Sequence, residues 1–200
     1  MRFFLSVGGR DYWGCEICEA RFLDPRHRPS RSEEYNRYLL HQNDPNDLGY
    51  RRFLSRLVDP LLTRLSSGSS GLDYGCGPVP VLVMMLRDAG HEMALYDPFF
   101  YPDPAPLQQY YDFVTCTETI EHFHRPAEEF DRLVTLVRSG GWLAIMTCFH
   151  GDDAGFAGWR YRADQTHVVF YREATLRFIA ESYGWRCEVP VKDVVLLRKP

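Results

Sequence analysis

The stretch SSGLDYGCGPVPVL (residues 69–82) contains the turn on which the fold depends. An apolar segment ends at Asp73 and Tyr74, two glycines follow at Gly75 and Gly77, and an apolar helical pattern begins after them. Glycines between a strand and a helix let the backbone approach a ligand closely, as in nucleotide-binding loops. Two glycines one residue apart also occur in plain turns, so the rest of the chain must decide between the two interpretations.

Beyond this loop, helical and strand patterns alternate. The pattern predicts helices over 79–89, from Pro126 to about 137, and around Leu176 to Tyr183, and it predicts buried strands at 91–97, 112–117 and 140–149. Two further strands, within 185–189 and 194–198, close the chain as a pair. Such alternation indicates an α/β fold, a doubly wound parallel sheet covered by helices on both faces.

The segment over residues 1–65 has a different character. Ser30 and Glu33 have the spacing of a capping box, and apolar residues recur at helical intervals from Tyr50 to Leu65. The segment SSGSSG (residues 66–71) then resembles a flexible joint. We therefore expect residues 1–65 to form a mainly helical lid or cap and residues 66–200 to form the main domain. Tyr35, Tyr38, His41, Asn43 and Tyr50 could cover a ligand, although for the tyrosines packing between helices is the preferred interpretation.

In a doubly wound sheet, ligands bind beyond the carboxyl ends of the strands, and residues 73–78 follow the first strand there. Asp97 ends the next strand well downstream of Gly77, at a position where a carboxylate can accept hydrogen bonds from ribose hydroxyls. The third glycine of dinucleotide-binding loops is replaced by Pro78-Val79-Pro80. This favours a nucleoside ligand without a pyrophosphate and argues against a dinucleotide-dependent oxidoreductase.

Four segments in order, GLDYGCGPVP, LYDPFF, YDFVTCTETIEHF and SGGWLAIMT, resemble the signature segments of class I S-adenosylmethionine-dependent methyltransferases. The resemblance covers about residues 71–198, and the segments around Cys15 and Cys18 and over 41–54 are similar to a bacterial subgroup of predicted methyltransferases. The resemblance implies a Rossmann-like doubly wound, mostly parallel sheet of seven strands that ends in a C-terminal antiparallel hairpin. It implies that S-adenosyl-L-methionine is the cofactor and that the following residues contact it: Asp73, Tyr74, Gly75 and Gly77 at the methionine part, Asp97 at the ribose, Pro98 and Phe99 at the adenine, and Thr117 and Glu118 by the sulfonium.

The sequence departs from this family at one place. Asp112 follows closely after Asp97, where the family has a further helix and strand, and the intervening residues are rich in proline. We therefore expect the sheet to lack one edge strand at this place. The alternative function is a non-catalytic nucleoside- or partner-binding module on the same fold.

The segment ETIEH predicts the acceptor end of the site. Glu118, Glu121 and His122 stand at positions i, i+3 and i+4 of a helical turn, with His122 as a candidate general base and Glu121 as the carboxylate that orients it. His167 lies in a later loop and could contact the acceptor. The same spacing resembles the metal-binding segment of some divalent-cation-dependent O-methyltransferases, with His167 as an added ligand. The preferred interpretation uses no metal, because the short motif also occurs in methyltransferases without one.

Composition limits the remaining classes. The 200 residues are 45% hydrophobic, carry a net charge of −4 and contain no run long enough to span a membrane, so we expect a cytoplasmic protein that binds neither membranes nor nucleic acid. Six scattered cysteines do not form a disulfide framework, and Cys15 and Cys18 lack a second ligand pair for zinc. The expected partner is a small-molecule acceptor, and the expected state is a monomer or homodimer.

Overall fold

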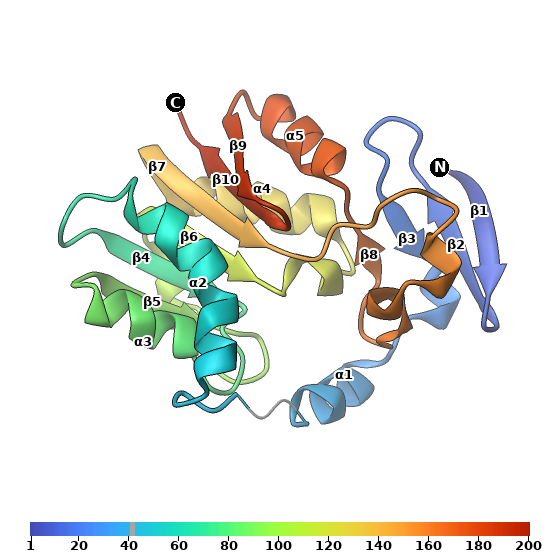
Figure 1. The fold of residues 1–200 in the computed structure, drawn as a ribbon, viewed down its shortest axis with the longest axis horizontal. Coiled ribbons are helices and arrows are strands. Elements are labelled where there is room, and N and C mark those ends of the chain that lie inside the picture. Colours follow the sequence, from blue (N-terminus) through green and yellow to red (C-terminus); the bar gives the residue numbers. More distant parts are fainter. Residues whose placement is uncertain (41–42) are drawn as a thin grey trace.

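The computed structural model describes residues 1–40 and 43–200, so the lid candidate His41 lies outside the described residues. In the described part, the main sheet has the strand order β5-β4-β6-β7-β10-β9 (Figure 1). The first four of these strands are parallel, and β10 is antiparallel to both β7 and β9. The strands are β4 (Ser70–Tyr74), β5 (Glu92–Tyr96), β6 (Tyr111–Thr117), β7 (Val137–Met146), β9 (Arg186–Val191) and β10 (Val194–Arg198). The predicted doubly wound sheet with its closing antiparallel hairpin is confirmed.

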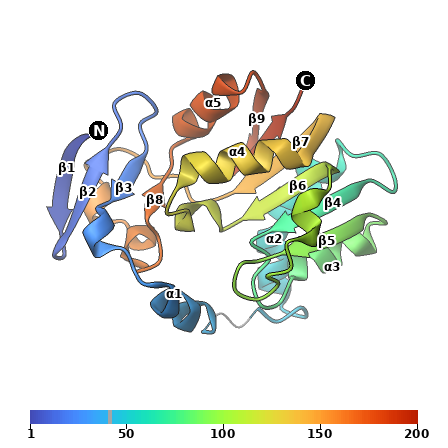
Figure 2. The same ribbon diagram turned by 180° about the vertical axis from the view of Figure 1, so that it is seen from behind.

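Helices cover both faces of this sheet. Figure 1 shows α2 (Leu48–Leu62) in front of the strands, with α3 (Val81–Asp88) beside it, and Figure 2 shows α4 (Pro126–Leu136) and α5 (Glu173–Ser182) over the other face. Each layer has its own apolar core: Leu57 and Leu86 are fully buried in one, and Leu133 and Leu176 in the other. This two-sided burial holds the sheet rigid beneath its carboxyl edge.

The N-terminal segment differs from the mainly helical one expected from the sequence. Residues 2–23 form three strands, β1 (Arg2–Val7), β2 (Arg10–Gly14) and β3 (Arg21–Leu23), which join β8 (Val169–Phe170) in a second, antiparallel sheet. Gly8 and Gly9 both have positive φ angles and form the turn between β1 and β2. Two adjacent glycines between strand-forming runs are typical of a β-hairpin, and this was the signal in the sequence for these strands.

The helices expected over 30–65 are present, but they lie in different places. Helix α1 (Arg31–Tyr38) begins at Ser30 with a capping box shared with Glu33, and it lies between the two sheets in both views (Figures 1 and 2). Helix α2 instead contacts α3, β7 and β10, so it forms part of the layer on the main sheet. Within the described residues, no helix is long and apolar enough to cross a membrane.

The prediction of a missing edge strand is confirmed. Strand β5 is the edge of the main sheet, and the backbones of Asp97 and Tyr101 exchange hydrogen bonds of 3.0 and 3.1 Å in a tight turn directly after it. A short 3-10 helix (Ala105–Gln108) then leads into β6. The prolines of this segment cannot supply the backbone N–H groups that a further strand needs.

Candidate functional site

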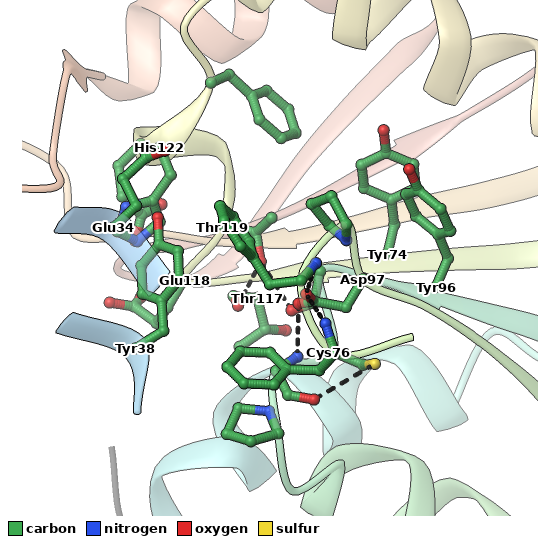
Figure 3. Close-up of a pocket in the computed structure, with 18 of the residues that line it drawn as sticks. Glu34, Tyr38, Tyr74, Cys76, Tyr96, Asp97, Thr117, Glu118, Thr119 and His122 are labelled. Atoms are coloured by element: carbon green, nitrogen blue, oxygen red, sulfur yellow. Dashed lines mark hydrogen bonds and ion pairs between the residues drawn. The ribbon is translucent and has the colours of Figure 1, made fainter. Parts of the chain in front are cut away.

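A cavity of about 870 Å³ opens at the carboxyl ends of β4, β5 and β6. Figure 3 shows Asp97 and Cys76 near its middle, Tyr74 and Tyr96 on one side, and Glu34, Tyr38, Glu118 and His122 on the other. All but one of the predicted site residues line this cavity: Tyr74, Gly75, Gly77, Asp97, Pro98, Phe99, Thr117, Glu118, Glu121, His122 and His167. The structure therefore brings together residues that lie far apart in the sequence, from Tyr74 to His167.

The two glycines of the loop serve different purposes. A Cβ atom on Gly75 would lie 2.2 Å from Cγ2 of Thr119, so this glycine allows the loop to pack against the segment after β6. A Cβ atom on Gly77 would meet no atom within 4 Å, so the backbone there is open to the cavity. Both glycines have positive φ angles, of +82° and +66°, which side-chain-bearing residues rarely adopt.

Asp97 organises the loop as well as lining the cavity. Its Oδ1 accepts hydrogen bonds from the backbone N–H groups of Phe99 and Phe100, at 2.8 and 3.0 Å. Its Oδ2 accepts one from the N–H of Gly77, at 3.0 Å. Because a carboxylate has about four acceptor positions, one position on Oδ2 remains for a ligand hydroxyl.

Aromatic rings build the wall next to Asp97. The ring of Phe99 stacks on Tyr35 at a centroid distance of 6.2 Å and meets Tyr38 edge-on at 5.2 Å. The guanidinium of Arg31 lies 4.8 Å from the centroid of the same ring. Helix α1 therefore covers this side of the cavity, with Tyr38 lining it and Tyr35 packing behind Phe99. Tyr50, from α2, also lines the cavity.

Asp73 is the one predicted residue that does not line the cavity. It lies beneath the loop, 4% exposed, and accepts a hydrogen bond of 2.7 Å from the hydroxyl of Thr115. Burial raises the pKa of its carboxyl to about 7, against the Thr115 hydrogen bond, and the charge of Asp97 adds to the increase. Asp73 thus supports the loop from below.

Glu118 and Glu121 meet at the hydroxyl of Tyr161. This hydroxyl lies 3.0 Å from Oε2 of Glu118 and also hydrogen-bonds Oε1 of Glu121, and the Thr147 hydroxyl donates to the other oxygen of Glu121 at 3.0 Å. One hydroxyl proton cannot serve two carboxylates at once. Burial and the nearby charge of Glu121 raise the pKa of Glu118 to about 9, so Glu118 carries a proton at neutral pH. The protonated Glu118 can then donate a hydrogen bond to the Tyr161 hydroxyl, while this hydroxyl donates to Glu121.

The expected common helical turn of Glu118, Glu121 and His122 differs from the structure. Glu118 has a φ of +48°, and the helical residues are only the 3-10 turn Ile120–His122. A left-handed conformation at a residue other than glycine costs about 1 kcal/mol or more and is frequent at functional sites. Glu118 and Glu121 are brought together by Tyr161, which lies in the short 3-10 helix Arg160–Ala163. The sequence analysis missed this residue, because nothing in the local pattern marks it.

The two predicted histidines, His122 and His167, lie next to each other in the cavity wall. Nδ1 of His122 hydrogen-bonds the carbonyl oxygen of Thr166 at 2.9 Å, and Nδ1 of His167 hydrogen-bonds that of Tyr161 at 2.8 Å. Their ring centroids are 4.8 Å apart. Burial lowers the pKa of His167 to about 4, so its imidazole is neutral near pH 7.

An ion pair and a hydrogen bond hold α1 against the rest of the cavity. Arg37 contacts Asp164 at 2.6 Å, and Glu34 contacts His124 at 2.9 Å. Glu34, His124 and Asp164 all line the cavity. These residues are widely separated in the sequence, and no local pattern predicts that they meet.

Cys15 and Cys18 are distant from this site in the sequence and lie in the turn between β2 and β3 as free thiols. Within the described residues, they do not belong to any cluster of three or more potential metal ligands.

Comparison with known proteins identifies relatives of this chain. A family described as a methyltransferase domain matches residues 47–188. A ubiquinone biosynthesis O-methyltransferase of Aeromonas salmonicida is 30% identical over 91 residues, which is 46% of this chain but only 38% of that protein. The match therefore spans well under half of the curated relative.

Two solved structures share the fold. The magnesium protoporphyrin IX methyltransferase of Synechocystis, with bound S-adenosylhomocysteine, aligns with a TM-score of 0.57 and 14% identity over 85% of this chain and 95% of that one. The 1,6-didemethyltoxoflavin-N1-methyltransferase of Burkholderia thailandensis, bound to 1,6-didemethyltoxoflavin and S-adenosylhomocysteine, aligns with a TM-score of 0.54 and 14% identity over 100% and 99%. At this identity the likeness concerns the fold.

Proposed function

Because this chain belongs to the methyltransferase-domain family, we propose that it binds S-adenosyl-L-methionine and transfers the methyl group to a small-molecule acceptor. The observation that carries the proposal is the cavity at the carboxyl ends of β4, β5 and β6, where the open backbone of Gly77 stands beside the carboxylate of Asp97. In doubly wound sheets this is the place where nucleosides bind.

The residues present fit such a cofactor. The Thr117 hydroxyl is buried at the cavity wall and has no hydrogen-bond partner among the described residues. A buried hydroxyl without a partner costs about 1–3 kcal/mol, which a polar ligand atom would offset. Asp97 keeps one acceptor position for a ribose hydroxyl, and Pro98 and Phe99 offer an apolar surface to a base. The remaining wall, with Glu118, Glu121 and the two histidines, is then left for the acceptor.

The chemistry needs few groups from the protein. S-adenosyl-L-methionine supplies a methyl carbon activated by its bond to a positively charged sulfur. The acceptor's lone pair forms the new bond to this carbon, the carbon–sulfur bond breaks with its electron pair left on the sulfur, and the acceptor's proton is released to a base. The protein holds the reactants in line and excludes water. Glu121, His122 and His167 line the part of the cavity left for the acceptor, so they are the residues that can contact it and take up its proton.

Calorimetric titration of the full chain with S-adenosyl-L-methionine and S-adenosylhomocysteine tests the proposal, with NAD as the negative control. Asp97→Asn keeps an oxygen for the loop N–H groups but removes the charge, and we expect affinity to fall about 10- to 100-fold. Asp88→Asn removes a carboxylate from an exposed position in α3 and serves as the matched control. A folded protein that binds neither nucleoside contradicts the proposal and leaves the non-catalytic module as the better description. Release of S-adenosylhomocysteine with a panel of acceptors then reports turnover.

A further inference from the structure

Cys15 and Cys18 lie in a tight turn that joins β2 to β3. The backbone N–H of Glu19 donates to the carbonyl oxygen of Cys15 at 3.0 Å, and the N–H of Cys15 donates to the carbonyl oxygen of Ala20, also at 3.0 Å. A turn closed by a hydrogen bond from residue i+4 to residue i places the Cα atoms of residues i and i+3 about 5 Å apart. Disulfides join cysteines whose Cα atoms are about 4.4–6.8 Å apart, so the backbone of this turn already has the separation that a disulfide needs.

The side chains of the two cysteines contact each other and are accessible. The thiol of Cys18 hydrogen-bonds the sulfur of Cys15. Both residues are half-buried, and Ile17 between them is 76% exposed, so small molecules in solution can reach the turn. The turn belongs to the second sheet, which lies beside the main sheet (Figure 1), and neither cysteine lines the main cavity. The pair is therefore separate from the site proposed for methyl transfer.

The surroundings of Cys15 favour its thiolate form. Burial by itself would raise the pKa of the Cys15 thiol, but hydrogen bonds to its sulfur from the backbone N–H groups of Cys18 and Ile17 outweigh burial and lower the pKa. Burial raises the pKa of Cys18, against a hydrogen bond from the backbone N–H of Ala20. Since the thiolate is the nucleophile, Cys15 is the more reactive of the two, and Cys18 stands beside it as a thiol.

The other cysteines of the chain have different surroundings. Cys76 and Cys116 are buried. Cys148 and Cys187 are half-buried, and burial raises the pKa of both thiols, that of Cys148 to about 11. The turn between β2 and β3 is therefore the place where access to solvent, a second thiol and a lowered pKa coincide.

We propose that Cys15 and Cys18 form a reversible disulfide by exchange with a low-molecular-weight disulfide, so that this turn is a site of redox modification. The Cys15 thiolate attacks one sulfur of the small disulfide, which leaves a mixed disulfide on Cys15 and releases one small thiolate. Cys18 then gives its proton to water, and its sulfur attacks Sγ of Cys15 and expels the second small thiolate. The two cysteines together lose two electrons and two protons, and the small disulfide takes up the two electrons as it becomes two thiols.

Oxidised glutathione tests this site on the full chain after dialysis against a chelator. We expect the intact mass to fall by about 2 Da per chain, with the new bond mapped between Cys15 and Cys18, and an excess of reduced glutathione to reverse the change. Cys18→Ser keeps the reactive thiol but removes the one that resolves the mixed disulfide, so it should accumulate a glutathione adduct at Cys15. Cys187→Ser removes another half-buried cysteine and should form the disulfide as the original does.

The rates of adduct formation test the order of the two steps. Cys15→Ser leaves the thiol whose pKa burial raises, so its Cys18 should form an adduct about 10-fold more slowly than Cys15 does in Cys18→Ser. Cooperative thermal unfolding of both variants shows that they are folded.

Three results would overturn the proposal. The first is an equal rate of adduct formation in the two variants. The second is a set of adducts on Cys148 and Cys187 without the loss of about 2 Da. The third is a zinc ion bound to the purified chain and lost in both variants, because it would make the two thiols metal ligands.

Discussion

Replacing Asp73 by asparagine should make the protein's stability less sensitive to pH. The carboxyl of Asp73 is buried beneath the glycine loop, where desolvation raises its pKa from 3.8 to about 7. Between these two values the folded state binds a proton that the unfolded state has lost, so the free energy of unfolding falls as the pH rises. An asparagine side chain at this position cannot ionise, and its amide oxygen can still accept the hydrogen bond from Thr115.

The size of the effect follows from the two pKa values. Each unit of pKa difference corresponds to about 1.4 kcal/mol, so the titration of this group lowers the free energy of unfolding by about 4 kcal/mol at pH 8 and about 1 kcal/mol at pH 4.5, relative to a side chain that cannot ionise. Asp73 is 4% exposed, so screening by solvent reduces this little. The difference in unfolding free energy between Asp73→Asn and the original should therefore grow by about 3 kcal/mol from pH 4.5 to pH 8. Any constant cost of the added amide cancels in this comparison.

Urea unfolding at several pH values measures this difference, and Asp112→Asn provides a control with the opposite sign. Burial alone would raise the pKa of Asp112, but hydrogen bonds from Ser70 and Arg138 outweigh it and lower the pKa. The Asp112 carboxylate therefore contributes stability above its unfolded pKa and loses it as the pH falls. Both pH 8 and pH 4.5 lie above the unfolded value of 3.8, so its removal should cost nearly the same at these two pH values, and the cost should shrink only at more acidic pH. A difference for Asp73→Asn that stays flat over this range would refute the assignment of a raised pKa.

Three substitutions test the loop and the buried acids. Gly75→Ala should destabilise the protein by about 3 kcal/mol, because its Cβ meets Thr119 and its φ is positive, whereas Gly77→Ala should cost about 1 kcal/mol from φ alone; equal losses in urea unfolding would show that the Thr119 contact is unimportant. Tyr161→Phe leaves the buried carboxylate of Glu121 without one donor and should lower the unfolding free energy at pH 7 by about 1–3 kcal/mol. A loss below about 0.5 kcal/mol in thermal unfolding would contradict the role given to this hydroxyl.

Local patterns predicted the elements of the main domain because each is short and strongly periodic. The loop from Asp73 to Gly77 and the acid at Asp97 follow from strand ends that face one edge of a parallel sheet. The proline-rich segment after Asp97 predicted the missing edge strand for a local reason, the absence of backbone N–H donors. All of the predicted site residues except Asp73 accordingly line one cavity.

Contacts between distant segments could not be predicted in this way. The strands over 2–23 were missed although Gly8-Gly9 signals a hairpin, since their partner β8 lies near the other end of the chain. Tyr161 lies in a single 3-10 turn, which is too short to show a periodic pattern, yet its hydroxyl joins Glu118 to Glu121.

The sequence by itself determined the doubly wound sheet, its closing hairpin and the place of the cavity, because strand and helix periodicities and turn residues act over a few positions. Only the tertiary structure decided that α2 packs on the main sheet, that Asp73 lies below the cavity, and that the imidazoles of His122 and His167 face one buried carboxylate. These features depend on burial and on side-chain direction. Both are set when distant segments meet in the folded chain, and neither is encoded by local spacing.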